Sequence, residues 1–213
     1  MLKERYNQLL ESIAMHAQNA GRDPAGIHLI AITKYATLEQ MMEAYKLGIR
    51  HFGESRLQVA LSKKLKFPSD VKWHYIGPLQ SNKAVKIATH FDYVHSVNSY
   101  ETAKLIAEKT SARPFLFLQV NTSKEGSKQG FSEEELLKEY AQIAALELNL
   151  IGLMTMAPLT SDAASIKKCF HQLRVLSEKI NLRHLSMGMS QDFPLAIAEG
   201  ATFLRIGSYL FDL

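Results

Sequence analysis

Short apolar runs alternate with amphipathic segments along most of the chain. Eight of the runs have the length and composition of β-strands, at residues 28–33, 50–52, 73–76, 93–97, 115–120, 150–156, 184–187 and 202–206. Between them, apolar side chains recur at intervals of three and four residues, which is the period of an amphipathic helix. This alternation predicts right-handed strand-helix-strand units and an all-parallel sheet.

Eight strands in this order are what a (β/α)8 TIM barrel requires, with a doubly wound open sheet as the main alternative. Residues 1–22 are expected to form an additional N-terminal helix. The chain stops about seven residues after the last strand, so this helix is expected to cover the place of the final barrel helix. No repeat, low-complexity tract or Gly/Ser linker divides the sequence. We therefore predict a single α/β domain over residues 1–213.

Polar residues mark the start of several expected helices. Thr37 with Gln40, and Ser132 with Glu135, have the spacing of a capping box. Ser81 or Asn82 is expected to cap the helix after the third strand, and Asp192 or Ser190 the short helix that contains Pro194. These positions set the expected boundaries between loops and helices.

Composition indicates an ordinary soluble globular protein, with 46% hydrophobic and 22% charged residues among 213. The net charge of +4 fits an anionic partner, but nothing beyond charge favours a nucleic-acid module. The lysines are spread over several helices and loops, as on a solvated surface, and include Lys63, Lys64, Lys66, Lys83, Lys86, Lys124, Lys128, Lys167 and Lys168.

The sequence favours a cytoplasmic protein without a membrane partner. Cys169 is the only cysteine, so no intramolecular disulfide can form, and we expect it in the core. Residues 1–22 carry charges throughout and lack the apolar stretch of a secretory signal. No apolar run reaches the roughly 18 residues that span a bilayer.

Lys34 is the first candidate for chemistry. It directly follows the first apolar strand, and in a β/α barrel functional groups lie where the strands end. We expect its stem to pack against apolar side chains, which would lower the pKa of the amine and make it nucleophilic. A lysine whose ammonium simply reaches solvent is the alternative.

The loops after the seventh and eighth strands form the usual phosphate site of such barrels. Here they supply hydroxyl groups, glycines that permit close backbone approach, and the start of a helix. The expected contributors are Ser186, Gly188, Ser190, Gly207 and Ser208.

A lysine facing a phosphate cradle admits two ligands, namely a phosphosugar held as a Schiff base or pyridoxal 5'-phosphate (PLP). Arg205, on the eighth strand, could face the pyridine nitrogen of PLP, where it would weaken the cofactor as an electron sink. It could equally form a buried ion pair with a carboxylate of the barrel. The eight histidines show no metal-ligand spacing, so no metal site is expected.

Several motifs together resemble the YggS/PROSC family of PLP homeostasis proteins. They are Ile32-Thr33-Lys34, His51-Phe52-Gly53-Glu54, His95-Ser96-Val97, Arg205-Ile206-Gly207, the run from Trp73 to Lys83 that reads WHYIGPLQSNK, and Ser186 to Ser190 that reads SMGMS. The similarity extends from about Leu29 to Phe211. The two long motifs carry most of its specificity.

The resemblance implies a barrel like the N-terminal domain of alanine racemase, with PLP bound to Lys34 as a Schiff base. Ser186, Ser190 and the backbone at Gly207 and Ser208 would then bind the phosphate, and Arg205 would face the ring nitrogen. Lys128 matches a family loop lysine associated with cofactor release. Departures from the family pattern are Ser55 in place of asparagine, Ala36 and Thr37 after the lysine, and the ending Phe211-Asp212-Leu213.

The expected function is intracellular PLP homeostasis and delivery without established turnover, with no catalytic residue assigned. PLP-dependent apoenzymes would be the acceptors, and the protein is expected to be a monomer. A PLP-dependent racemase-like enzyme is the alternative, although a two-base racemase needs a second acid or base that alanine racemase takes from an added domain and a partner chain. A phosphosugar aldolase without cofactor is a third possibility.

Overall fold

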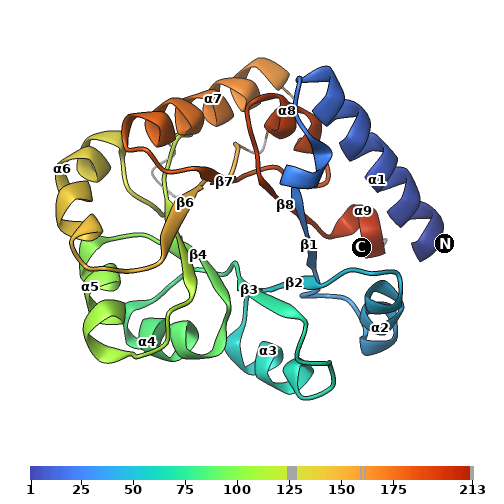
Figure 1. The fold of residues 1–213 in the computed structure, drawn as a ribbon, viewed down its shortest axis with the longest axis horizontal. Helices are drawn as coiled ribbons and strands as arrows, with labels where there is room; N and C mark the ends of the chain where they lie inside the picture. The colour runs from blue at the N-terminus through green and yellow to red at the C-terminus, as the bar shows by residue number, and fades with distance from the viewer. Residues whose placement is uncertain (124–128, 159, 161, 212–213) are drawn as a thin grey trace.

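Eight parallel strands close into a barrel in the computed structural model, which describes residues 1–123, 129–158, 160 and 162–211 (Figure 1). Every strand pairs with the next one along the chain, and β1 pairs with β8 to close the ring. The strands are β1 His28–Ile32, β2 His51–Glu54, β3 Lys72–Tyr75, β4 Tyr93–Val97, β5 Phe115–Gln119, β6 Leu150–Met154, β7 His184–Ser186 and β8 Phe203–Ile206. The barrel is confirmed and the open sheet is excluded.

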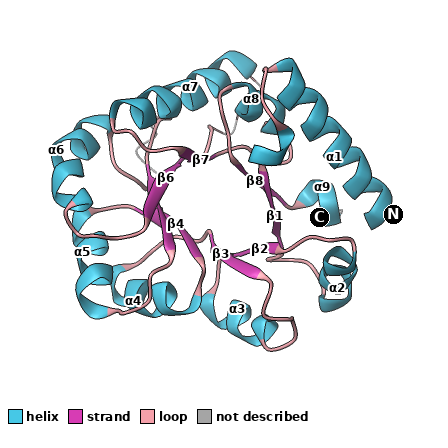
Figure 2. Cartoon of the chain, in the orientation of Figure 1, coloured by secondary structure: helices cyan, strands magenta, loops and turns pink. Residues whose placement is uncertain are grey.

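Helices surround the barrel in a ring (Figure 2). Those that follow strands are α2 Leu38–Lys46, α3 Leu57–Lys64, α4 Ser81–His90, α5 Tyr100–Lys109, α6 Glu133–Ala144, α7 Ala163–Lys179, α8 Phe193–Ala198 and α9 Ser208–Phe211. The N-terminal helix α1, Leu2–Asn19, packs against α8 and α9, and a 3-10 turn η1, Pro24–Gly26, leads into β1. Helix α1 thus lies beside the one-turn helix α9 that follows β8.

Helix starts agree with the sequence in two cases and differ in two. Thr37 and Ser132 cap α2 and α6, each in a reciprocal capping box. The prediction for α4 was wrong, because its N-cap is Gln80 and no side chain caps it. Asp192 occupies the N-cap position of α8, but its carboxylate accepts a hydrogen bond from the Met189 N–H instead of from the helix.

Two separate apolar clusters hold the fold together. The larger one fills the space between the barrel and its helices, and it contains Cys169, which is buried as predicted. The smaller one lies inside the barrel and consists of Ile30, Ile32, Phe117, Met154 and Phe203. Because successive strand residues face opposite sides, β1, β5, β6 and β8 contribute to both clusters.

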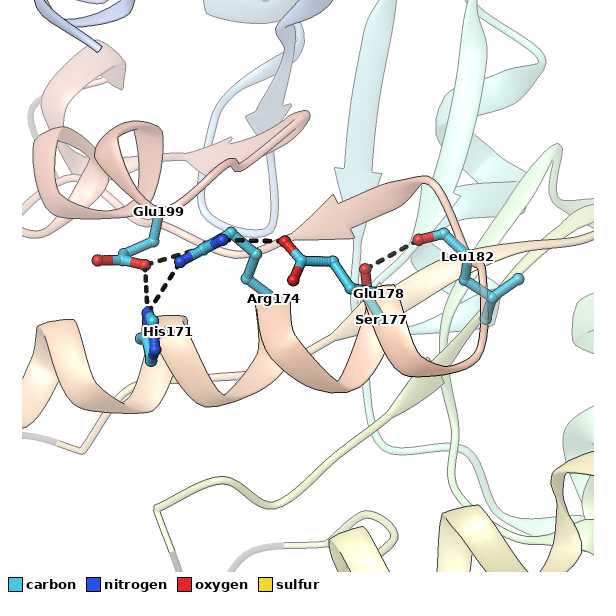
Figure 3. A network of polar contacts seen from close by, with 6 residues as sticks. All are labelled: His171, Arg174, Ser177, Glu178, Leu182 and Glu199. Atoms are coloured by element: carbon cyan, nitrogen blue, oxygen red, sulfur yellow. Dashed lines mark hydrogen bonds and ion pairs between the residues drawn. The ribbon is translucent and has the colours of Figure 1, made fainter.

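Polar contacts fix α8, which links the last two strands. Glu199, directly after α8, is buried, and its carboxylate lies 3.1 Å from His171 Nδ1 and 3.3 Å from Arg174 Nε on α7 (Figure 3). From the segment after α1, the Arg22 guanidinium donates to the carbonyl oxygens of Ile197 at 2.8 Å and Ala201 at 2.7 Å. The C-terminal end of α8 and the segment that leads into β8 are therefore held in place.

Within the described part of the chain, no helix is long and apolar enough to cross a membrane.

Candidate functional site

Lys34 lies at the carboxyl end of β1, one residue beyond the buried Thr33. Its side chain is exposed, and its ammonium lies 4.9 Å from the ring centroid of Tyr35, which is itself exposed. The expectation that its stem packs against apolar side chains was wrong. The reason is geometric, since Lys34 follows the last residues of β1 that pack on either cluster.

A buried polar group lies directly beneath Lys34. Lys63, from α3, donates to the carbonyl oxygen of Thr33 at 2.7 Å and to Glu54 Oε1 at 2.6 Å. The Thr33 hydroxyl donates to the same carboxylate oxygen at 2.8 Å. Lys63 is only 9% exposed, so the prediction that it belongs to the solvated surface was wrong. This group fixes the peptide that carries Lys34.

The loop after β7 is shaped by Gly188. Its φ is +93°, a conformation that side-chain-bearing residues rarely adopt, and a Cβ there would lie 2.6 Å from Ala196 Cβ. The Gly188 carbonyl accepts the Arg205 N–H at 3.0 Å, and the Ser190 hydroxyl accepts the Tyr209 N–H at 3.2 Å. The loops after β7 and β8 are therefore joined by direct hydrogen bonds.

Two backbone N–H groups are available where these loops meet. Within the described residues, those of Gly207 and Ser208 donate to no protein acceptor. The Arg205 N–H points toward the β7 loop, and alternate N–H groups of an extended chain share a direction, so the Gly207 N–H points there too. Free N–H groups beside the hydroxyls of Ser190 and Ser208 are donors of the kind that an anion requires.

The free N–H groups and the hydroxyls described above form a cradle, and this cradle lies next to Lys34. Residues Ala31 and Ile206 are paired across β1 and β8, and a Cβ at Gly207 would lie 3.2 Å from Ile32 Cβ. The strand ends that carry Lys34 and the free N–H groups are thus immediate neighbours. Of the predicted site residues, the structure brings Lys34, Gly188, Ser190, Gly207 and Ser208 to one edge of the barrel.

Arg205 is buried at 6% exposure. Its guanidinium donates from Nη1 to the Ser186 hydroxyl at 2.7 Å and from Nη2 to the Thr155 carbonyl at 2.8 Å. Burial lowers the pKa of Arg205 to about 10, and the nearby charge of Asp192 partly opposes that shift. In the part of the chain that the structure describes, Arg205 makes no ion pair, so the alternative interpretation as a buried salt bridge is not observed.

Asp192 is the acidic residue whose charge acts on this guanidinium. Burial raises the pKa of its carboxyl group, while the Met189 N–H and the charge of Arg205 act in the opposite direction. Its Oδ1 accepts the Met189 N–H at 2.5 Å. Asp192 therefore orders the loop after β7 and faces Arg205 without a direct contact.

Ser186 lies deeper than expected. It is the last residue of β7, it is fully buried, and its hydroxyl lies 2.8 Å from His95 Nδ1 as well as 2.7 Å from Arg205 Nη1. Ser190 is instead a partly buried loop residue, and Ser208 is an exposed residue at the start of α9. The structure thus separates Ser186 from the loop hydroxyls and places it in a contact with Arg205.

Behind Ser186, three histidines cross the barrel interior, one from each of β2, β3 and β4. His51 Nδ1 lies 2.8 Å from His74 Nε2, and His74 Nδ1 lies 2.9 Å from His95 Nε2. This row of three histidines was not predicted from the sequence, because the histidines were considered there only as metal ligands. Their inward position on three consecutive strands was the available signal. Among the described residues no cluster could hold a metal ion.

A cavity of about 380 Å³ lies between α7 and the loops after β5 and β6. It is lined by residues after β5 and β6 and by α7, among them Thr122, Lys168 and Cys169. Thr122 Oγ1 lies 2.9 Å from the Thr155 hydroxyl, and the Thr155 carbonyl accepts from Arg205. Thr155 therefore contacts both Arg205 and a residue that lines this cavity.

Lys124 and Lys128, noted in the sequence, lie outside the described residues.

Comparison with known proteins assigns the family. No family model matches the chain. The "Pyridoxal phosphate homeostasis protein" of Pseudomonas aeruginosa is 41% identical over 217 residues, with 99% of this chain and 94% of that protein covered. The chain belongs to the pyridoxal phosphate homeostasis protein family. The resemblance stated from the sequence is thereby confirmed.

Solved structures of this family share the fold. PipY of Synechococcus elongatus, without PLP, is similar with a TM-score of 0.88 and 37% identity, and 99% of this chain and all of that chain are covered. A second structure of PipY has PLP bound and gives a TM-score of 0.85. Alanine racemase of Clostridium difficile has a TM-score of 0.72 at 15% identity, with 56% of that chain covered, which shows a shared barrel fold.

Proposed function

We propose that this member of the pyridoxal phosphate homeostasis family binds PLP at the edge of the barrel formed by β1, β7 and β8. The observation that carries the proposal is the adjacency of Lys34 to a cradle of free N–H and hydroxyl groups. The aldehyde of PLP reacts with a lysine amine, forming a C=N Schiff base and releasing water. Lys34 is the amine that this geometry offers.

The phosphate of the cofactor would be held by the joined loops. Gly207 and Ser208 supply free backbone N–H groups, and Ser190 and Ser208 supply hydroxyls. Gly188 makes this cradle possible, because only a residue without a side chain fits its backbone conformation beside Ala196. The charge of Arg205, buried nearby and balanced by no direct ion pair, adds attraction for a dianionic group.

Arg205 would face the ring nitrogen of the cofactor. Its Nη1 and Nη2 are committed to Ser186 and Thr155, which fixes the plane of the guanidinium. An arginine cannot pass a proton to a pyridine nitrogen as a carboxylic acid would, because its pKa of about 10 keeps it protonated as a donor. The cofactor would therefore be bound without being strongly activated as an electron sink.

This arrangement supports a role in holding and delivering PLP inside the cell rather than in turnover, with PLP-dependent apoenzymes as acceptors. Lys34 is exposed, which suits a site that must load and release its ligand. Racemase-like turnover is the alternative, and it would need a second acid or base opposite Lys34. Steady conversion of amino-acid enantiomers by the loaded protein would favour that alternative.

The decisive experiment is an absorption spectrum of the protein titrated with PLP, followed by borohydride reduction and peptide mapping. We expect a yellow complex whose reduced adduct maps to Lys34 and is lost in Lys34→Ala. Lys109→Ala, an exposed lysine at the end of α5, is the matched control and should bind PLP as the unaltered protein does. A colourless protein, or an adduct at another lysine, would contradict the proposal.

A further inference from the structure

A continuous chain of hydrogen bonds runs through the barrel interior and ends at Arg205. It begins at the half-buried His51, passes through His74 and His95, and reaches Ser186, with every donor-to-acceptor distance between 2.7 and 2.9 Å. His74, His95 and Ser186 are all fully buried. Four strands and four side chains thus connect the guanidinium to the opposite end of the barrel.

Only one direction of donation along these hydrogen bonds gives every donor an acceptor. Arg205 is a donor and never an acceptor, so the Ser186 oxygen accepts from it and the Ser186 hydroxyl is left to donate to His95 Nδ1. His95 then carries its proton on Nε2 and donates it to His74 Nδ1, and His74 Nε2 donates to His51 Nδ1. The reverse arrangement would leave the Ser186 hydroxyl proton without an acceptor among the described residues.

Burial keeps these imidazoles neutral. Desolvation lowers the pKa of His51 to about 4 and holds the pKa values of His74 and His95 well below the usual 6.5. His28, Lys72 and Asp92 face His51, and Arg205 faces His95; of these charges only Asp92 favours protonation.

Aromatic rings enclose the chain. The His74 ring stacks on Tyr93 at 4.2 Å between centroids, and the His95 ring stacks on Phe117 at 4.4 Å. Apolar side chains of the same size would fill this space without leaving polar atoms to be satisfied. The cost of burying His74 and His95 therefore points to a requirement beyond packing.

We propose that His95 and Ser186 are positioning residues, which hold Arg205 with a fixed orientation and a fixed donor pattern toward the ring nitrogen of the bound cofactor. His74 and His51 lock the tautomer of His95 and so prevent the Ser186 hydroxyl from turning. This inference rests on the proposed function for the role of Arg205. The hydrogen-bond direction itself does not depend on the cofactor.

The tautomers can be tested on the ligand-free protein by nitrogen NMR of 15N-labelled histidine at pH 7. We expect His51, His74 and His95 each to carry a proton on Nε2 and none on Nδ1. In Ser186→Ala, His95 Nδ1 loses its donor, so its nitrogen resonance should shift toward that of an imidazole without a hydrogen bond. Protons on Nδ1 of these histidines would overturn the inference, whatever the protein binds.

The effect on the cofactor is tested by PLP titration of the variants. In Ser186→Ala a charge-assisted hydrogen bond is lost, so we expect the affinity for PLP to fall by up to about tenfold and the absorption band to shift. His95→Gln, whose amide can still accept and donate, should retain more affinity than His95→Phe. Ser96→Ala removes a neighbouring buried hydroxyl without a partner among the described residues and should match the unaltered protein.

The outcomes separate the two proposals. If the unaltered protein takes up no PLP, the proposed function fails, while the tautomers measured by NMR stand or fall independently. If it binds PLP and Ser186→Ala and His95→Phe bind with unchanged affinity and unchanged spectrum, the positioning role is overturned. If Ser96→Ala weakens binding as much as Ser186→Ala, the effect belongs to packing and the inference is likewise wrong.

Discussion

The Lys63 ammonium donates to the carbonyl oxygen of Thr33 over 2.7 Å, one residue before Lys34. The same ammonium pairs with Glu54 at 2.6 Å, and both side chains are buried. A carbonyl group at the end of a barrel strand normally has no strand partner beyond it. Lys63 satisfies this group from α3 and thereby holds the backbone from which the site lysine extends.

Lys63→Met is therefore expected to leave the Glu54 carboxylate buried without its cation. Breaking a buried ion pair by removing one partner costs about 3–5 kcal/mol of folding free energy. The backbone at Lys34 also loses its support, so the affinity for PLP should fall. Urea unfolding followed by fluorescence, together with PLP titration at a temperature where the variant is folded, measures both effects.

Lys66→Met is the matched control, because Lys66 is exposed in the turn after α3. Its unfolding free energy should change by no more than about 0.5 kcal/mol. The double variant Lys63→Met with Glu54→Leu should recover part of the lost stability, since no charge then remains buried. Equal stability of Lys63→Met and Lys66→Met would contradict this account of the network.

We expect the free energy of unfolding to fall as the pH is lowered. The fall should begin well above the pH at which carboxylates usually titrate. Between pH 6.5 and about 4, unfolded histidines take up protons while the buried His74 and His95 and the half-buried His51 do not, because their folded-state pKa values are lowered. The unfolded state binds more protons there, so stability falls as pH decreases. Each histidine that stays neutral contributes about 1.4 kcal/mol per pH unit. Asp192, with its raised pKa, acts in the opposite direction.

The measurement is the urea midpoint and unfolding free energy at half-unit steps from pH 7.5 to 4.5. His74→Gln removes one titrating group while keeping an amide that can donate and accept, so its slope should be lower by about one proton. A stability that stays flat over this range would show that the histidines are protonated in the folded protein.

The fold could be predicted from the sequence because its signals are local. All eight expected strands overlap the observed ones, and the strand expected at 93–97 is β4, Tyr93–Val97, with both ends as predicted. Periodicity records which face of each segment is buried, and the order of segments then determines the barrel. The N-cap of α4 was predicted wrongly because serine is a residue type that often caps helices. Ser81, however, is already the first residue of the helix, and Gln80 occupies the N-cap position.

The site could be predicted only where strand order decides it. Lys34 and Gly207 follow strands that must be neighbours in a closed barrel, so their adjacency was foreseeable. The contact between Ser186 and His95 spans 91 residues and depends on strand register across the interior. Lys63 could not be distinguished from a surface lysine, since its burial depends on how α3 packs beside β2. These non-local contacts leave no periodic trace in the sequence.

Gly188→Ala should damage both the cradle and the fold, and Gly48→Ala provides the comparison. Both glycines have a φ near +100°, so each alanine costs about 1–2 kcal/mol of backbone strain. At Gly48 a Cβ meets nothing within 4 Å, whereas at Gly188 it would lie 2.6 Å from Ala196 Cβ. Gly188→Ala should therefore lose a further 1–3 kcal/mol or so, through overpacking. It should also bind PLP more weakly, while Gly48→Ala binds normally. Equal unfolding free energies and equal PLP affinities in the two variants would show that the loop after β7 can move aside without cost.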